Sequence, residues 1–367
     1  MRYKEDISAV AFLGNSTLLI KQKTKQAVSN ANINTMKLLK VILSPVLISL
    51  FLFMFFAGCS NKHHETTPIK SKGQVINDVI YENTKDWKGN DEALKMDIYM
   101  PANARAGKKY PLVLFMHGGG FLIGDKESAH NKCSILADSG FVAVSLNYRL
   151  GWDKGNETCK GNVEELEEAG YRAIQDANTA LGFLVLNAAK YSIDTSWIFA
   201  GGSSAGAIAA LCMTYLNDSN IKNYYPTAAA KLGSLKSVGS EASNTFSIKA
   251  ICSISGALPD SALINKQTAL PAIYFHGEND ETIPADAGHY ASCNSYPQIY
   301  GSECLYRALA RLNIPVVAHI MPRTGHDDDN DFTDEFKMSN TAYFFHKIMN
   351  KEIPQSGLYF GVINNRP

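Results

Sequence analysis

Residues Trp197 to Ala207 read WIFAGGSSAGA, the pattern of a buried strand, a tight turn and a closely packed helix. Only Ser204 has a glycine both two positions before it and two positions after it, at Gly202 and Gly206. This G-x-S-x-G spacing in a strand–turn–helix context holds a serine hydroxyl on a strained turn. The N-terminus of the following helix supplies free N–H groups that favour negative charge. A glycine- and serine-rich turn without chemistry is the alternative interpretation.

A second glycine-rich segment lies upstream of Ser204. The apolar run 112–116 predicts a strand buried on both faces, and the next residues, His117 to Phe121, read HGGGF. Consecutive glycines let backbone N–H groups point at an incoming anion. Acyl transfer needs such donors, because its tetrahedral intermediate carries a negatively charged oxygen.

Apolar runs and helical patterns alternate over residues 73–367, which we expect to form one large domain. This alternation predicts the α/β class, with a central, mostly parallel sheet and helices on both of its faces. Segments 151–165 and 217–247 lack a strong period, so we expect them to be excursions around the active face. The expected strands are 75–81, 94–99, 112–116, 141–146, 197–200, 248–254, 273–275 and 316–320, and the expected helices are 169–191, 205–216, 304–312 and 334–349.

Taken together, the two glycine motifs resemble the α/β-hydrolase fold, in its HGGG-type carboxylesterase and lipase family. The resemblance covers roughly residues 75–350. It implies an oxyanion hole formed by the backbone N–H groups of Gly119, Gly120 and Ala205. It also implies that His117 is a structural residue of the loop and not the catalytic base.

The resemblance further implies a catalytic acid downstream of the serine. Asp280 matches this role because it ends the segment His276 to Asp280, HGEND, directly after an expected strand. The rival carboxylates nearby are Glu278, Glu281 and Asp286.

A catalytic histidine must follow the acid in this family. His326 matches because it lies in a loop between the expected strand 316–320 and the last expected helix. We expect His289, His319 and His346 to be ordinary structural histidines.

A Ser204, His326 and Asp280 triad predicts a serine carboxylic-ester hydrolase that works through an acyl-enzyme. We expect short acyl esters or acylated saccharides as substrates. The chemistry needs no metal and no organic cofactor. The acidic run 327–329 lacks the alternating spacing of a calcium loop and is expected to be solvated. A serine exopeptidase of the same fold and a non-catalytic binding lipoprotein remain the alternatives.

Composition excludes several other classes of protein. Hydrophobic residues make up 46% of the 367 residues and charged residues 19%, which argues against wholesale disorder. Lys and Arg together number 35, as do Asp and Glu, so the formal net charge is zero. Nucleic-acid binding over a broad surface needs a basic excess, so we expect no nucleic-acid partner.

The N-terminal region predicts an export signal. Residues 36–58 combine lysines, an apolar run from 41 to 57 and small residues directly before Cys59. This layout resembles the signal peptide of a bacterial lipoprotein, which implies cleavage before Cys59, lipidation of that cysteine and attachment to a membrane of the cell envelope. A plain transmembrane anchor is the alternative, because the run approaches the length of a bilayer span.

Two polar segments flank this signal. Residues 1–35 precede the Met36 at which the signal begins, and they are interpreted as an upstream extension from a mis-assigned start. Residues 59–72 are expected to be a polar tether to the catalytic domain.

Apart from Cys59, the chain contains six cysteines, and export permits them to pair. Cys293 and Cys304 lie close together in the sequence, so they are the expected disulfide. Cys212 and Cys252 are expected to be small buried apolar residues, because they fall within an expected helix and an expected strand.

Overall fold

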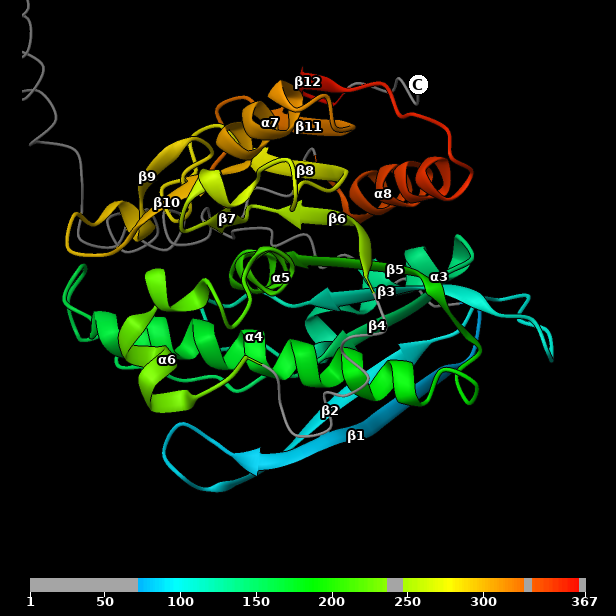
Figure 1. Ribbon diagram of the computed structural model, residues 1–367, viewed down its shortest axis with the longest axis horizontal. Coiled ribbons are helices and arrows are strands. Elements are labelled where there is room, and N and C mark those ends of the chain that lie inside the picture. Colours follow the sequence, from blue (N-terminus) through cyan, green and yellow to red (C-terminus); the bar gives the residue numbers. More distant parts are fainter. Residues whose placement is uncertain (1–71, 236–246, 327–331, 363–367) are drawn as a thin grey trace, which may run out of the picture. The chain divides into compact units, whose positions relative to one another are not determined.

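The computed structural model describes residues 72–235, 247–326 and 332–362. The signal, Cys59, the upstream extension and the acidic run 327–329 lie outside these residues. The described residues form a nine-stranded sheet in the order β1-β2-β4-β3-β5-β6-β8-β11-β12 (Figure 1). The strands are β1 Val75–Lys85, β2 Asp91–Tyr99, β3 Tyr110–Met116, β4 Val142–Leu146, β5 Ile193–Ser203, β6 Ile248–Ile254, β8 Ala272–Gly277, β11 Val316–Met321 and β12 Gly357–Phe360.

The sheet is mostly parallel, as the alternating pattern predicts. Strand β2 runs antiparallel to both of its neighbours, β1 and β4, and every other pair in the sheet is parallel. Strands β3, β4, β8 and β11 are buried at every residue, because helices cover them on both sides.

Two groups of helices cover the two faces of the sheet (Figure 1). Helices α3 His130–Asp138 and α8 Asp334–Met349 share one apolar core with the sheet. Helices α4 Val163–Leu186, α5 Ala205–Tyr215, α6 Pro226–Leu232 and α7 Ser302–Arg311 contribute to the core on the other side. This is the layered arrangement that the sequence predicts.

The two predicted excursions contain structure that their sequence pattern did not reveal. Helix α4 begins at Val163, because the Asn162 side chain accepts a hydrogen bond from the Glu165 N–H and caps the helix. Helix α6 lies within the segment expected to be irregular. In the described residues no helix has the length and apolar character that crossing a membrane would require.

A second, three-stranded sheet is built from the segments that follow the main strands. Its order is β7-β10-β9, with β7 Ala257–Leu258, β9 Ala287–His289 and β10 Gln298–Gly301. Two short 3-10 helices lie near this sheet in the sequence, η4 Ser261–Leu263 and η5 Tyr290–Ser292. Two others lie earlier in the chain, η1 Lys126–Ala129 and η2 Ile221–Asn223.

The predicted Cys293–Cys304 disulfide is wrong. Cys293 pairs with Cys159, 134 residues away, with a Cα–Cα distance of 5.4 Å. Cys304 is a free thiol that lies 2.8 Å from the Asp286 carboxylate. Closeness in sequence was misleading, because Cys304 is on helix α7 whereas Cys293 faces the loop before α4. Cys212 and Cys252 are free and buried, as expected.

We predict that the Cys159→Ser variant, made together with Cys293→Ser, is less stable to denaturant than the parent. A covalent link that closes a loop of 134 residues restricts the unfolded chain, and such links contribute about 2–4 kcal/mol to the free energy of unfolding. Equilibrium urea unfolding measures the difference. The matched control is Cys304→Ser, which should leave the free energy unchanged within about 0.5 kcal/mol. Equal midpoints for all three proteins would contradict the assignment of the disulfide.

Candidate active site

Ser204 lies on the turn between strand β5 and helix α5. Its backbone has φ 53° and ψ −123°, a strained conformation that is uncommon for a residue with a side chain. The turn is tight because the neighbouring backbone is close: a Cβ on Gly206 would lie 2.3 Å from the carbonyl oxygens of Met116 and His117. Glycine at this position therefore lets the helix approach strand β3.

The structure brings the three predicted triad residues together from distant parts of the sequence. Ser204 Oγ lies 2.7 Å from His326 Nε2, and His326 Nδ1 lies 2.6 Å from Asp280 Oδ2. The Asp280 side chain is fully buried, whereas the His326 side chain keeps 13% of its surface exposed. The hydroxyl is thus in contact with a base whose opposite nitrogen is oriented by a buried carboxylate.

Asp280 receives more hydrogen bonds than the triad alone requires. The N–H groups of Thr282 and Ile283 donate to its Oδ1 at 2.9 and 2.8 Å. A second histidine, His276, places its Nε2 3.2 Å from Asp280 Oδ2. Burial on its own raises the pKa of Asp280, but the hydrogen bonds from His276 and His326 outweigh it and hold the pKa well below its usual range. The Asp280 carboxyl group is therefore ionised at neutral pH.

The loop that follows strand β3 presents backbone donors next to this serine. A Cβ on Gly118 would lie 3.2 Å from the Ser204 Cβ, so the loop lies directly against Ser204. Gly119 has φ 115°, and a Cβ there would lie 2.0 Å from the Ile123 carbonyl oxygen. Within the described part of the chain, the N–H groups of Gly119, Gly120 and Ala205 donate to no acceptor. Free amides beside a nucleophile are what an oxyanion hole requires.

Aromatic side chains fix the shape of this loop. His117 is buried, stacks on Tyr148 with ring centroids 4.4 Å apart, and keeps its Nδ1 2.6 Å from the Gly118 carbonyl oxygen. Burial lowers the pKa of His117, so the ring is neutral at neutral pH. The Tyr148 hydroxyl donates to the His117 carbonyl at 2.7 Å. These contacts agree with the structural role expected for His117.

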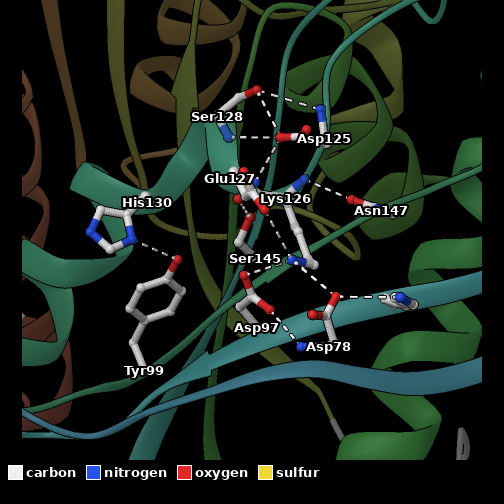
Figure 2. A network of polar contacts seen from close by, with 11 residues as sticks. Asp78, Asp97, Tyr99, Asp125, Lys126, Glu127, Ser128, His130, Ser145 and Asn147 are labelled. Atoms are coloured by element: carbon white, nitrogen blue, oxygen red, sulfur yellow. Dashed lines mark hydrogen bonds and ion pairs between the residues drawn. The ribbon is translucent and has the colours of Figure 1, made fainter. Parts of the chain in front are cut away.

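A buried ion pair anchors the far end of the same loop (Figure 2). Lys126 Nζ lies 3.0 Å from Asp97 Oδ2 on strand β2, and both side chains are almost fully buried. The Lys126 N–H donates to Asn147 Oδ1 at 2.7 Å, and the Ser145 hydroxyl donates to the Lys126 carbonyl at 2.6 Å. The main and side chains of Lys126 thus tie the loop to two strands.

The rival residues have other surroundings. Glu278 accepts a hydrogen bond from the Arg323 N–H, and Asp286 pairs with Arg307. The Glu281 carboxylate is on an exposed residue. Of the histidines, His289 contacts the Tyr296 carbonyl, His319 stacks on Phe275 and Tyr359, and His346 contacts the Ser139 carbonyl.

Sequence reasoning missed His276 and Lys126 as parts of the site. His276 is the first residue of the HGEND segment, 276–280. That segment predicted the position of Asp280, but it did not indicate that His276 contacts the Asp280 carboxylate. No local pattern marks Lys126, because its partner Asp97 lies on strand β2 and only folding brings the two together.

Parts of the chain are similar in sequence to known proteins. The family model described as BD-FAE matches residues 96–267. Carboxylesterase 1C of Rattus norvegicus is 27% identical over 46% of this chain, and Carboxylesterase 1E of Mus musculus is 27% identical over 47%. The matched parts are only 29% and 30% of those two proteins, so the chain spans about a third of the length of these relatives.

Solved structures show the same fold. Thermogutta terrifontis esterase 2 phosphorylated by paraoxon has a TM-score of 0.52 and 18% identity, with 79% of this chain and 99% of that one covered. A truncated form of a carbohydrate esterase from gut microbiota has a TM-score of 0.52 and 15% identity, with 77% and 99% covered. The described part of the chain therefore has the α/β-hydrolase fold. In sequence, the chain is similar to this family model and to parts of these carboxylesterases.

Proposed function

We propose that this protein is a serine carboxylic-ester hydrolase with Ser204 as nucleophile, His326 as base and Asp280 as acid. The observation that carries the proposal is the continuous contact from Ser204 Oγ through the His326 ring to Asp280 Oδ2. The N–H groups of Gly119, Gly120 and Ala205, which donate to no acceptor in the described residues, support it further.

In the first half of the reaction, Ser204 Oγ attacks the ester carbonyl carbon while its proton moves to His326 Nε2. Asp280 accepts the hydrogen bond from His326 Nδ1 and stabilises the imidazolium that forms. The carbonyl oxygen gains negative charge, which the N–H groups of the oxyanion hole bind. The bond to the alcohol oxygen then breaks, and His326 gives its proton to the leaving alcohol.

In the second half, water takes the place of the alcohol. His326 removes a proton from the water, whose oxygen attacks the acyl carbon of the acyl-enzyme. The bond between Ser204 Oγ and the acyl carbon breaks, the serine recovers its proton from His326, and the carboxylic acid leaves. The chain's own residues therefore complete the hydrolysis.

We propose short acyl esters as the substrates, with the alcohol part a small molecule or a saccharide. Three aromatic side chains, Trp152, Tyr290 and Tyr296, form a wall next to Gly120, which we call the aromatic wall. Flat aromatic rings suit the apolar faces of a sugar or of a small acyl group.

A panel of chromogenic substrates tests the function. We expect rapid hydrolysis of p-nitrophenyl acetate and butyrate and of acetylated saccharides, and no cleavage of aminoacyl p-nitroanilides. Cleavage of the anilides without the esters would indicate an exopeptidase instead. A folded protein that binds these esters without cleaving any of them would indicate a binding protein.

We also propose that the protein is a lipoprotein of the bacterial cell envelope, cut before Cys59 and lipidated there. The support is the sequence of residues 36–59. Mass spectrometry of the protein extracted from membranes should find a lipid on an N-terminal Cys59, and Cys59→Ala should prevent the modification. A mature chain that keeps residues 36–58 would contradict this proposal.

A further inference from the structure

The Tyr290 hydroxyl lies beside Gly120, in the loop that follows strand β3. A Cβ built on Gly120 would lie 3.4 Å from the Tyr290 hydroxyl oxygen, which is ordinary contact distance. Tyr290 is half-buried, and among the described residues its hydroxyl has no hydrogen-bond partner. A phenol placed beside a row of free amides and left without a partner is available to a ligand.

The position of Tyr290 is fixed from several directions. The Tyr290 N–H donates to the Pro297 carbonyl at 3.1 Å, and the Ala291 N–H donates to the Thr282 carbonyl at 2.7 Å. The Ser292 hydroxyl donates a further hydrogen bond to the Glu281 carbonyl at 2.9 Å. The tyrosine is thus tied to the loop that carries Asp280.

The backbone next to Tyr290 is strained. Ala291 and Ser292 have φ values of 53° and 54°, in the left-handed region that side chains disfavour. Backbone strain of this kind gathers at functional sites.

The disulfide holds the other members of the aromatic wall against the same loop. Cys159–Cys293 joins the segment after Trp152 to the segment after Tyr290. The Trp152 indole donates to the Gly120 carbonyl at 2.9 Å, and the Gly161 N–H donates to the Tyr296 hydroxyl at 2.9 Å. Trp152 therefore binds the Gly120 carbonyl, and the Tyr290 hydroxyl lies next to the same residue.

We propose that Tyr290 is a further catalytic residue, whose hydroxyl donates a hydrogen bond to the substrate's carbonyl oxygen as that oxygen becomes negatively charged. Tyr290 would act alongside the N–H groups of the oxyanion hole. This inference rests on the function proposed above. The step transfers no proton, because Tyr290 keeps its hydrogen throughout. Burial raises the pKa of the Tyr290 phenol, so it remains a donor across the neutral range.

The test is Tyr290→Phe, which removes the hydroxyl and keeps the ring. Loss of one oxyanion donor lowers turnover by about 10²–10³-fold elsewhere, and we expect kcat on p-nitrophenyl acetate to fall by about 10- to 100-fold because the backbone donors remain. KM should change by less than about threefold, since the bond strengthens only in the transition state. The matched control is Tyr191→Phe, which removes a buried hydroxyl that has no partner in the described core and should leave kcat unchanged.

A second measurement separates this inference from the proposed function. The rate constant for phosphorylation of Ser204 by paraoxon also depends on the oxyanion hole, and Tyr290→Phe should lower it in parallel with kcat. A Tyr290→Phe variant with wild-type kcat and wild-type phosphorylation rate would overturn the role of Tyr290. So would a change confined to KM, which would indicate a side wall and not a donor. A wild-type protein that reacts with paraoxon but hydrolyses no ester would instead contradict the proposed function, and the phosphorylation rates would still decide the role of Tyr290.

Discussion

Ser204→Ala should abolish the hydrolysis of p-nitrophenyl acetate, with kcat falling by at least about 10⁴-fold. Removing a triad nucleophile leaves only the oxyanion hole and substrate binding, and losses near 10⁶-fold have been measured in another serine hydrolase. The reason in this chain is geometric: Ser204 Oγ is the hydroxyl in contact with His326 Nε2. Steady-state kinetics on the purified variant measures the loss.

The neighbouring serine provides a matched control. Ser203 ends strand β5, and its hydroxyl is buried with no hydrogen-bond partner in the described part of the chain. Ser203→Ala should therefore keep kcat within about twofold of the parent. If Ser203→Ala loses activity and Ser204→Ala does not, the register of the nucleophile is wrong by one residue.

Asp280→Asn should lower kcat by about 10³–10⁴-fold while leaving the protein folded. The amide keeps the shape of the side chain, but it cannot stabilise the imidazolium and it favours the wrong tautomer of His326. The effect should be largest at neutral pH, because the lowered pKa of Asp280 keeps it ionised there in the parent. Kinetics at several pH values, with circular dichroism to verify the fold, measures the change.

The rival carboxylates supply the control for this variant. Glu281→Gln changes an exposed carboxylate next to Asp280 in the sequence and should alter kcat by less than about threefold. Near-complete loss of activity in Glu281→Gln, with Asp280→Asn active, would move the catalytic acid to Glu281.

Much of the fold could be predicted because its signals are local. Short apolar runs predicted the parallel strands, and the G-x-S-x-G turn placed Ser204 between strand β5 and helix α5. The spacing of Gly202 and Gly206 around Ser204 indicated the register, and in the structure Gly206 packs closely against the carbonyl oxygens of Met116 and His117. Motif order located Asp280 and His326, whose contacts with each other and with Ser204 exist only in the folded chain.

The remaining features depend on contacts that no local pattern encodes. The Cys159–Cys293 pair spans 134 residues, so spacing along the chain favoured the wrong partner for Cys293. The Lys126–Asp97 pair links a loop to a strand that precedes it in the sequence. Tyr290 is one tyrosine among 17, and its position beside Gly120 results from a small sheet whose strands are only two to four residues long.

Covalent labelling tests the central claim, that Ser204 is a nucleophile activated by His326 and Asp280. The protein is treated with paraoxon, digested and analysed by mass spectrometry, with His326→Ala treated in parallel. We predict one diethylphosphoryl group per chain, located on Ser204, and no modification of Ser204 in the His326→Ala variant over the same time. A group on another residue, or equal labelling of Ser204 in both proteins, would contradict the account.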